Sequence, residues 1–314
     1  MPTGARLKGD TLKLEVYPQL SLIFSLTRYG DRGVPIFFCL SGFLIMYSLD
    51  SKSTSVTAFY LKRFFRIVPL YYTIVTVLVY FYPMPIDELG LGWLRYYFFM
   101  NEIIPAEHQE WVSICGFWCI PSFIIFYLIA PIIHKYAGHF KFMGILVIFS
   151  YLIGKLLTVL LADYYYINPV HSFINTMPIF FYGCFCYSAN KCNKQSIFLL
   201  ISTCILIISA TLNFSNYQVW GVATAAVIVI LRDMQLPRKI RESNFLFYFS
   251  KLSFTIFLSH YIVLLYLNTL DLSAYIYILL FVFITGIIAF VLFSTVEKWS
   301  DITLKRIMCL LYKK

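Results

Sequence analysis

Long apolar stretches separated by short polar segments dominate the sequence. Most of them are about 17–25 residues long, the length that an α-helix needs to cross the roughly 30 Å apolar core of a bilayer. The pattern predicts about nine membrane-spanning helices, over residues 34–50, 67–83, 117–134, 142–161, 173–188, 196–213, 218–231, 249–268 and 274–296. We therefore expect an all-α, polytopic integral membrane protein with no soluble domain.

The segments between these stretches alternate in charge. One alternate set carries most of the lysines and arginines, whereas the other is mainly acidic and has Arg95 as its one basic residue. Because basic residues collect in cytoplasmic loops, the basic set is expected to be cytoplasmic, and the C-terminus with it. This divides the chain into an outer-side lead-in over residues 1–33, a helical domain over 34–296 and a basic cytoplasmic tail over 297–314.

The composition agrees with the prediction of a membrane protein and argues against several kinds of binding site. Of the 314 residues, 60% are hydrophobic and 13% are charged, whereas soluble domains are about 45–50% apolar and about 25% charged. The net charge of +10 is explained by the basic loops, so no nucleic-acid partner is expected. The eight cysteines lack a second Cys or His pair at zinc-site spacing, so we expect neither a metal site nor a disulfide framework.

A basic cluster marks the entry to the second predicted helix, in the segment YLKRFFRIVPLYY over residues 60–72. Arg63 and Arg66 are three residues apart, and residues at this spacing share one face of a helix. Arginine side chains suit phosphates and pyrophosphates, which makes a phosphorylated cytoplasmic donor one interpretation. The alternative is that both arginines only flank a membrane helix, as the positive-inside rule requires.

Other ionisable residues within or beside the apolar stretches are candidates because charge is costly at membrane depth. His260, halfway along the eighth predicted helix, is interpreted either as a proton shuttle or general base or as a hydrogen-bonded core residue. Lys155, in the fourth, either serves a pathway or extends outward to the interface. Asp31 and Arg32 precede the first predicted helix and either contact an acceptor or mark the membrane boundary.

Several segments, in order, resemble membrane-bound acyltransferase family 3, typified by bacterial O-antigen and exopolysaccharide O-acetyltransferases. GDRGVPIFFCLSGFLI resembles the family's G-x-x-G-V-x-x-F-F-x-x-S-G-F-L-I segment, and FYLKRFFRIVPLYY resembles its Y-x-x-R-R-x-x-R-I-x-P-x-Y segment. FWCIPSFIIFYLIAPII, FSKLSFTIFLSHYIVLLY and VEKWSDITLKR are similar to three later segments. The resemblance covers about residues 28–306.

The resemblance implies about ten helices and transfer of an acetyl group from cytoplasmic acetyl-CoA to a hydroxyl of a lipid-linked or surface polysaccharide sugar, such as lipopolysaccharide, in a bacterial inner membrane. The implied partners are membrane lipid, acetyl-CoA and the glycan, with no permanently bound cofactor. It implies that Arg63 and Arg66 contact the CoA phosphates, and that the small Ser41-Gly42 step lets an acyl chain or a neighbouring helix approach closely. Four more positions match the family with less defined roles: His260, Trp118, Tyr127 and Glu297.

The chain also departs from the family pattern in two places. The family has an earlier helix that bears an Arg and a His, and no residues before Arg28 match it, so the segment at 34–50 corresponds to the family's second helix. The carboxylate expected after Trp118 is replaced by Phe123-Ile124-Ile125. Two alternatives to an active O-acyltransferase therefore stay open: a non-catalytic relative, and a transporter of glycan precursors.

Overall fold

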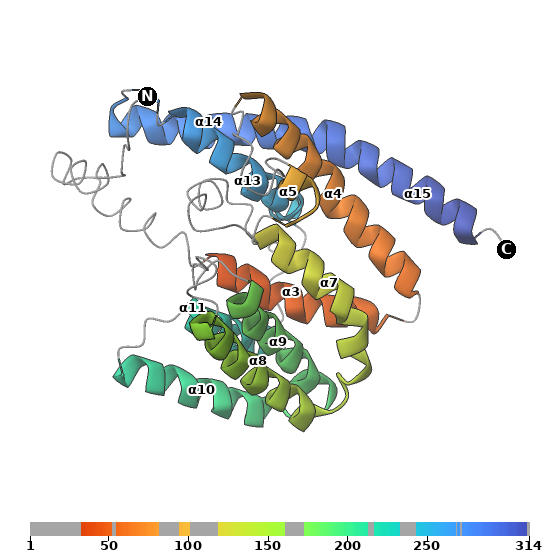
Figure 1. Cartoon of the computed structure of the whole chain (residues 1–314), viewed down its shortest axis with the longest axis vertical. Helices are drawn as coiled ribbons and strands as arrows, with labels where there is room; N and C mark the ends of the chain where they lie inside the picture. Colours follow the sequence, from red (N-terminus) through yellow and green to blue (C-terminus); the bar gives the residue numbers. More distant parts are fainter. Residues whose placement is uncertain are drawn as a thin grey trace.

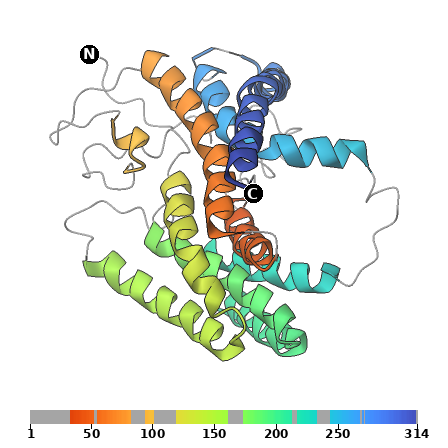
Figure 2. The same cartoon turned by 90° about the vertical axis from the view of Figure 1, so that its right-hand side faces the viewer.

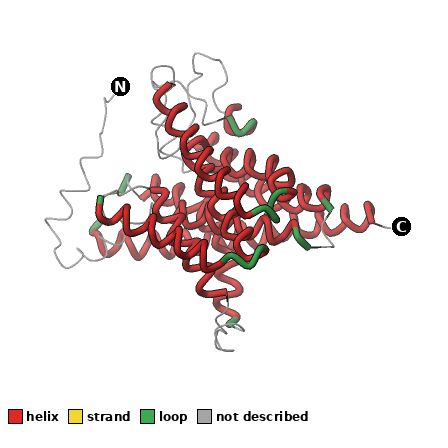
Figure 3. The backbone as a smooth tube through the Cα atoms, turned by 90° about the horizontal axis from the view of Figure 1, so that it is seen from below, coloured by secondary structure: helices red, strands yellow, loops and turns green. Residues whose placement is uncertain are grey.

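The computed structural model describes residues 33–51, 55–81, 94–100, 119–160, 173–212, 217–232, 243–267, 269–270 and 272–312. This part of the chain contains helices and loops but no strand (Figure 3), which confirms the all-α class. The elements are α3 (Gly33–Leu49), α4 (Val56–Phe81), α5 (Leu94–Tyr97), α7 (Cys119–Lys135), α8 (Phe140–Leu160), α9 (Phe173–Lys191), α10 (Gln195–Thr211), α11 (Tyr217–Arg232), α13 (Asn244–Leu267), α14 (Ala274–Leu292), the π-helical turn η4 (Phe293–Glu297) and α15 (Lys298–Tyr312).

Several of these helices have the length and composition of membrane spans. Among the described residues, three stretches are long and apolar enough to cross a bilayer: Val56–Tyr80, Phe140–Leu160 and Tyr275–Leu311. Four shorter apolar helices accompany them: Gly33–Leu49, Cys119–Lys135, Gln195–Thr211 and Gln218–Leu231. The chain is therefore an integral membrane protein, whereas the number of about nine crossings stays a prediction.

The second predicted helix begins earlier than its apolar stretch. The sequence pattern places its start at residue 67, but α4 begins at Val56, so Arg63 and Arg66 lie inside the helix rather than at its entry. A hydropathy pattern stops at charged residues, yet lysine and arginine are good helix formers. The Ser55 hydroxyl accepts a hydrogen bond from the Ala58 N–H (3.1 Å) and caps this earlier start.

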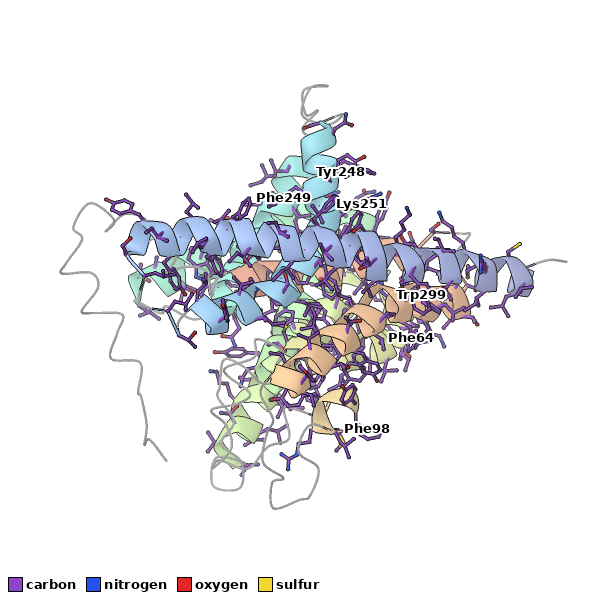
Figure 4. All side chains as sticks on the ribbon, turned by 90° about the horizontal axis from the view of Figure 1, so that it is seen from above. Phe64, Phe98, Tyr248, Phe249, Lys251 and Trp299 are labelled. Atoms are coloured by element: carbon purple, nitrogen blue, oxygen red, sulfur yellow. The ribbon has the colours of Figure 1, made fainter. Side chains whose placement is uncertain are left out.

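The last predicted span continues into the basic tail. α14, η4 and α15 form one long rod that runs from residue 274 to 312 (Figure 1), so residues 298–312 are helical. α15 packs against α4, where the Ser300 hydroxyl donates a hydrogen bond to the Phe65 carbonyl. Phe64 and Trp299 remain more than half exposed on the outer side of this helix pair (Figure 4), as expected for side chains that face lipid.

α9 forms the centre of the bundle and contacts α3, α8 and α11 (Figure 1). Its residues 175–190 are all buried. Where α3 crosses α9, a methyl group on Gly42 would lie 2.2 Å from the Phe180 carbonyl oxygen, and one on Gly183 would lie 2.1 Å from the Cys39 carbonyl oxygen. Since both obstacles are backbone atoms, only glycine fits at either position, and the two helix backbones touch.

Three of the loops in the basic set, those that follow α3, α7 and α9, lie at one end of the bundle. The Asp50 carboxylate, just after α3, lies 2.5 Å from the Lys191 ammonium and 3.5 Å from the His134 imidazole. Hydrogen bonds from Lys191 and from Tyr187 hold the pKa of the Asp50 carboxyl below its ordinary value. The start of α4 and the end of α15 lie at this same end (Figure 1), in agreement with the grouping of loops by charge. That this end is cytoplasmic stays a prediction.

The glycine crossing can be tested by stability. Gly42→Ala and Gly183→Ala are each expected to destabilise the fold by about 1–3 kcal/mol or more, because the added methyl group forces two backbones apart. Gly286→Ala is the matched control, since a methyl group there meets open space. Thermal unfolding of the detergent-purified variants measures the effect, and a melting temperature for either crossing variant equal to that of Gly286→Ala would contradict the assignment.

Candidate functional site

A cavity of about 210 Å³ lies between α3, α4, α7 and α13. Four residues singled out from the sequence line it together, although they come from three separate segments: Ser41, Arg63, Arg66 and Tyr127. The rest of the wall consists mainly of apolar side chains with two serines from α13: Phe37, Leu44, Ile45, Ile67, Phe123, Phe254, Ser250 and Ser253. α4, which carries both arginines, lies between α7 and α15 (Figure 2).

Arg66 is held in place by the C-terminal part of the chain. Its Nη1 lies 2.6 Å from Glu297 Oε2, and its Nη2 donates a hydrogen bond to the Lys251 carbonyl oxygen (3.2 Å). The other Glu297 oxygen accepts a hydrogen bond from the Thr255 hydroxyl. Figure 4 shows Lys251 on α13 beside the long α14–α15 rod. Because Glu297 is only 6% exposed, its charge is matched by Arg66 rather than by water.

Arg63 has a different environment. Its guanidinium carbon lies 5.3 Å from the ring centroid of Tyr127 and 5.6 Å from that of Phe59, within the range of cation–π interactions. The ion pairs found among the described residues do not include Arg63. An aromatic ring orients a guanidinium without cancelling its charge, so Arg63 is the better placed of the two arginines to bind an anion in the cavity.

Ser41 and Gly42 lie on two different faces of α3. Successive residues of a helix are about 100° apart, so neighbours in sequence face different directions. Gly42 contacts α9, whereas Ser41 lines the cavity. Of the two expectations for this step, an acyl chain or a neighbouring helix, the structure thus places a helix at Gly42.

His260 lies on α13 but does not line this cavity. Its Nδ1 is 2.6 Å from the Phe257 carbonyl oxygen. It is six residues beyond the cavity-lining Phe254, or about 9 Å along the helix axis. The Phe257 ring neighbours both His260 and the wall residue Phe37: its centroid is 6.0 Å from the imidazole and 6.0 Å from the Phe37 ring. A catalytic role for His260 stays a prediction.

Of the remaining predicted residues that the structure describes, Lys155 does not line this cavity. Lys155 lies on α8, with its ammonium 5.6 Å from the ring centroid of Tyr151. Asp31, Arg32 and Trp118 fall outside the described residues. The structure therefore unites the arginine pair with Ser41 and Tyr127, and separates them from Lys155.

The sequence does not predict the residues that hold Arg66. Glu297 only matches a position of the family, and no pattern points to Thr255. The available signal was Glu297 itself, a carboxylate that directly follows a long apolar stretch. Such a residue needs a counter-charge, but nothing in the sequence indicates which arginine supplies it.

Comparisons with known proteins identify the family. A family model described as an acyltransferase domain, acyltransferase family 3, matches residues 12–296. A protein of Acidianus two-tailed virus, named "Putative acetyltransferase ORF330", is 32% identical over 152 residues, which are 45% of this chain and 43% of that relative. The matched part is thus less than half of the relative's length. No solved structure matches the chain.

The link between Arg66 and Glu297 can be measured by a double-mutant cycle. Arg66→Ala and Glu297→Ala are each expected to lower stability, and the double variant is expected to lose less than the sum of both. The expected coupling is about 0.5–3 kcal/mol. Thermal unfolding in detergent gives the values. Lys62→Ala with Glu297→Ala is the control cycle, because Lys62 is an exposed cation on the same helix, and equal coupling in both cycles would rule out a specific pair.

Proposed function

The chain belongs to acyltransferase family 3, and from this premise we propose that it is a membrane O-acyltransferase. We further propose that it transfers an acetyl group from acetyl-CoA to a hydroxyl of a lipid-linked or surface polysaccharide sugar. The single observation that carries the proposal is the cavity in which two arginines, a serine and a tyrosine meet within an apolar wall. The name of the viral relative supports acetyl as the group transferred.

The arginines favour a phosphorylated donor. Guanidinium groups bind pyrophosphate through paired, charge-assisted hydrogen bonds. Arg63 lies one turn closer than Arg66 to the start of α4, which is at the basic end of the bundle. A donor that arrives from that end meets Arg63 first. Arg66, whose charge is balanced by Glu297, forms part of the cavity wall one turn further along α4.

The proposed transfer needs little more than orientation and charge. The sugar hydroxyl oxygen forms a bond to the thioester carbonyl carbon, the carbon–sulfur bond breaks, and the hydroxyl proton passes through a base to the thiolate. Negative charge develops on the carbonyl oxygen, where fixed donors and cations are most effective in an apolar setting. Ser41, Tyr127 and Arg63 are the candidates for this stabilisation. His260 remains the candidate base, although it does not line the cavity.

The position of His260 favours one second candidate, a family member that binds acetyl-CoA without transferring the acetyl group. In this case His260 is a hydrogen-bonded core residue. The two functions differ in one measurable way. Membranes that contain the full chain, supplied with acetyl-CoA and glycan, form O-acetyl esters only under the first.

The donor site can be tested with Arg63→Ala. Loss of a charge-assisted hydrogen bond costs about 1.5–3 kcal/mol, so the KM for acetyl-CoA is expected to rise about 10–100-fold. Membranes that contain the full chain are supplied with radiolabelled acetyl-CoA, and label in the glycan fraction is counted. Lys62→Ala removes the same charge from the adjacent, exposed position and is expected to leave KM unchanged. An unchanged KM in Arg63→Ala would remove this arginine from the donor site.

A further inference from the structure

A second cavity lies on another side of α9, between α8, α9, α10 and α11. Its volume is about 280 Å³, and it shares no lining residue with the cavity that contains the arginines. Figure 1 shows these four helices together, away from α4, α13 and the long rod. Apolar side chains such as Val147, Pro178 and Val222 form most of its wall. The cavity therefore needs an explanation of its own.

One end of this second cavity is polar. Gln218 and Ser209 belong to its lining. Gln218 Nε2 donates a hydrogen bond to the Asn175 carbonyl oxygen (3.4 Å), and Asn175 Nδ2 donates one to the Thr158 hydroxyl (3.1 Å). These bonds set Gln218, Asn175 and Thr158 at one level, near the starts of α11 and α9 and the end of α8. The cavity thus has an apolar body and a polar rim.

Lys155, an exposed cation, lies one turn beyond the cavity-lining Tyr151 on α8. It follows Val147 and Tyr151 at intervals of four residues, so the three share the face of α8 that borders the cavity. A lysine that simply extends to the interface would point toward the nearby end of α8 at Leu160. Instead its ammonium lies 5.6 Å from the ring centroid of Tyr151, one turn back toward the apolar body. The ion pairs found among the described residues do not include Lys155.

The cavity also borders a surface that faces lipid. Ile148 on its edge is 61% exposed, and Leu152 and Ile208 beside it are 59% and 55% exposed. An occupant with a hydrocarbon chain can therefore enter from the bilayer without crossing water. A cation at membrane depth is stabilised by a counter-charge close to it. A hydrocarbon chain attached to a negatively charged headgroup is the defining feature of an anionic phospholipid.

We propose that this second cavity binds one anionic phospholipid. An acyl chain lies along the apolar wall, the phosphate pairs with Lys155, and the headgroup accepts hydrogen bonds from Gln218 and Ser209. A zwitterionic lipid fits less well, because its own cation already neutralises the phosphate. The site lies apart from the proposed donor site, so it does not depend on the proposed acyl transfer.

The test compares lipids that stay bound to the purified full chain. The protein is exchanged into mixed vesicles of phosphatidylglycerol and phosphatidylcholine, re-extracted, and its retained lipids are quantified by mass spectrometry. We expect enrichment of phosphatidylglycerol over the bulk mixture, and a several-fold loss of that enrichment in Lys155→Gln. Lys155→Arg and Lys141→Gln are expected to keep it, because Lys141 is an exposed cation at the opposite end of the same helix.

A second variant tests the apolar part separately. Val219→Phe fills the cavity without changing charge and is expected to lower retention of phosphatidylglycerol to the level of Lys155→Gln, with the melting temperature as a check that the variant folds. Equal enrichment in the wild type and Lys155→Gln would overturn the proposal. So would equal retention of phosphatidylcholine, or preferential retention of a lipid-linked saccharide offered in the same vesicles.

Discussion

The backbone contact between α3 and α9 is the constraint on which the rest of the bundle depends. At Gly42 and Gly183 the two helices touch through main-chain atoms, so neither can rotate or slide without a clash. Interfaces between membrane helices use small residues in this way because lipid gives little hydrophobic drive for helices to associate. With Gly42 fixed against α9, the next face of α3 is fixed too, and Ser41 is held toward the cavity.

The ion pair with Glu297 is a second constraint, and it gives Arg66 a different environment from Arg63. A single motif places them one turn apart on α4, yet Arg66 pairs with Glu297 and Arg63 rests against aromatic rings. The π-helical turn at Phe293–Glu297 contributes to this difference. A π-turn adds a residue to a helical turn, so the repeat of side chains on α15 is out of phase with that on α14 by about 100°. α14 thereby packs on α13 while Glu297 and Ser300 face α4.

Much of the fold and of the candidate site could be predicted from the sequence. The parts that could not be predicted have identifiable physical reasons. The cores of the helices follow from apolar stretches, and Ser41, Arg63, Arg66 and Tyr127 follow from motif resemblance. The start of α4 and the continuation of α14 into α15 could not be predicted from hydropathy, because charged residues interrupt an apolar pattern without ending a helix. The meeting of those four residues in one cavity depends on tertiary packing that spacing along single helices does not encode.

The same limit applies to partners that are distant in sequence. Lys155 is recognisable as a costly charge, but the cavity near it is lined by residues of α8, α9, α10 and α11. Glu297 is 231 positions from Arg66. Ribosomes add about 5–20 residues per second, so Arg66 is added to the chain roughly 12–46 seconds before Glu297. During synthesis Arg66 therefore has no Glu297 to pair with until long after α4 is made, and their ion pair forms late.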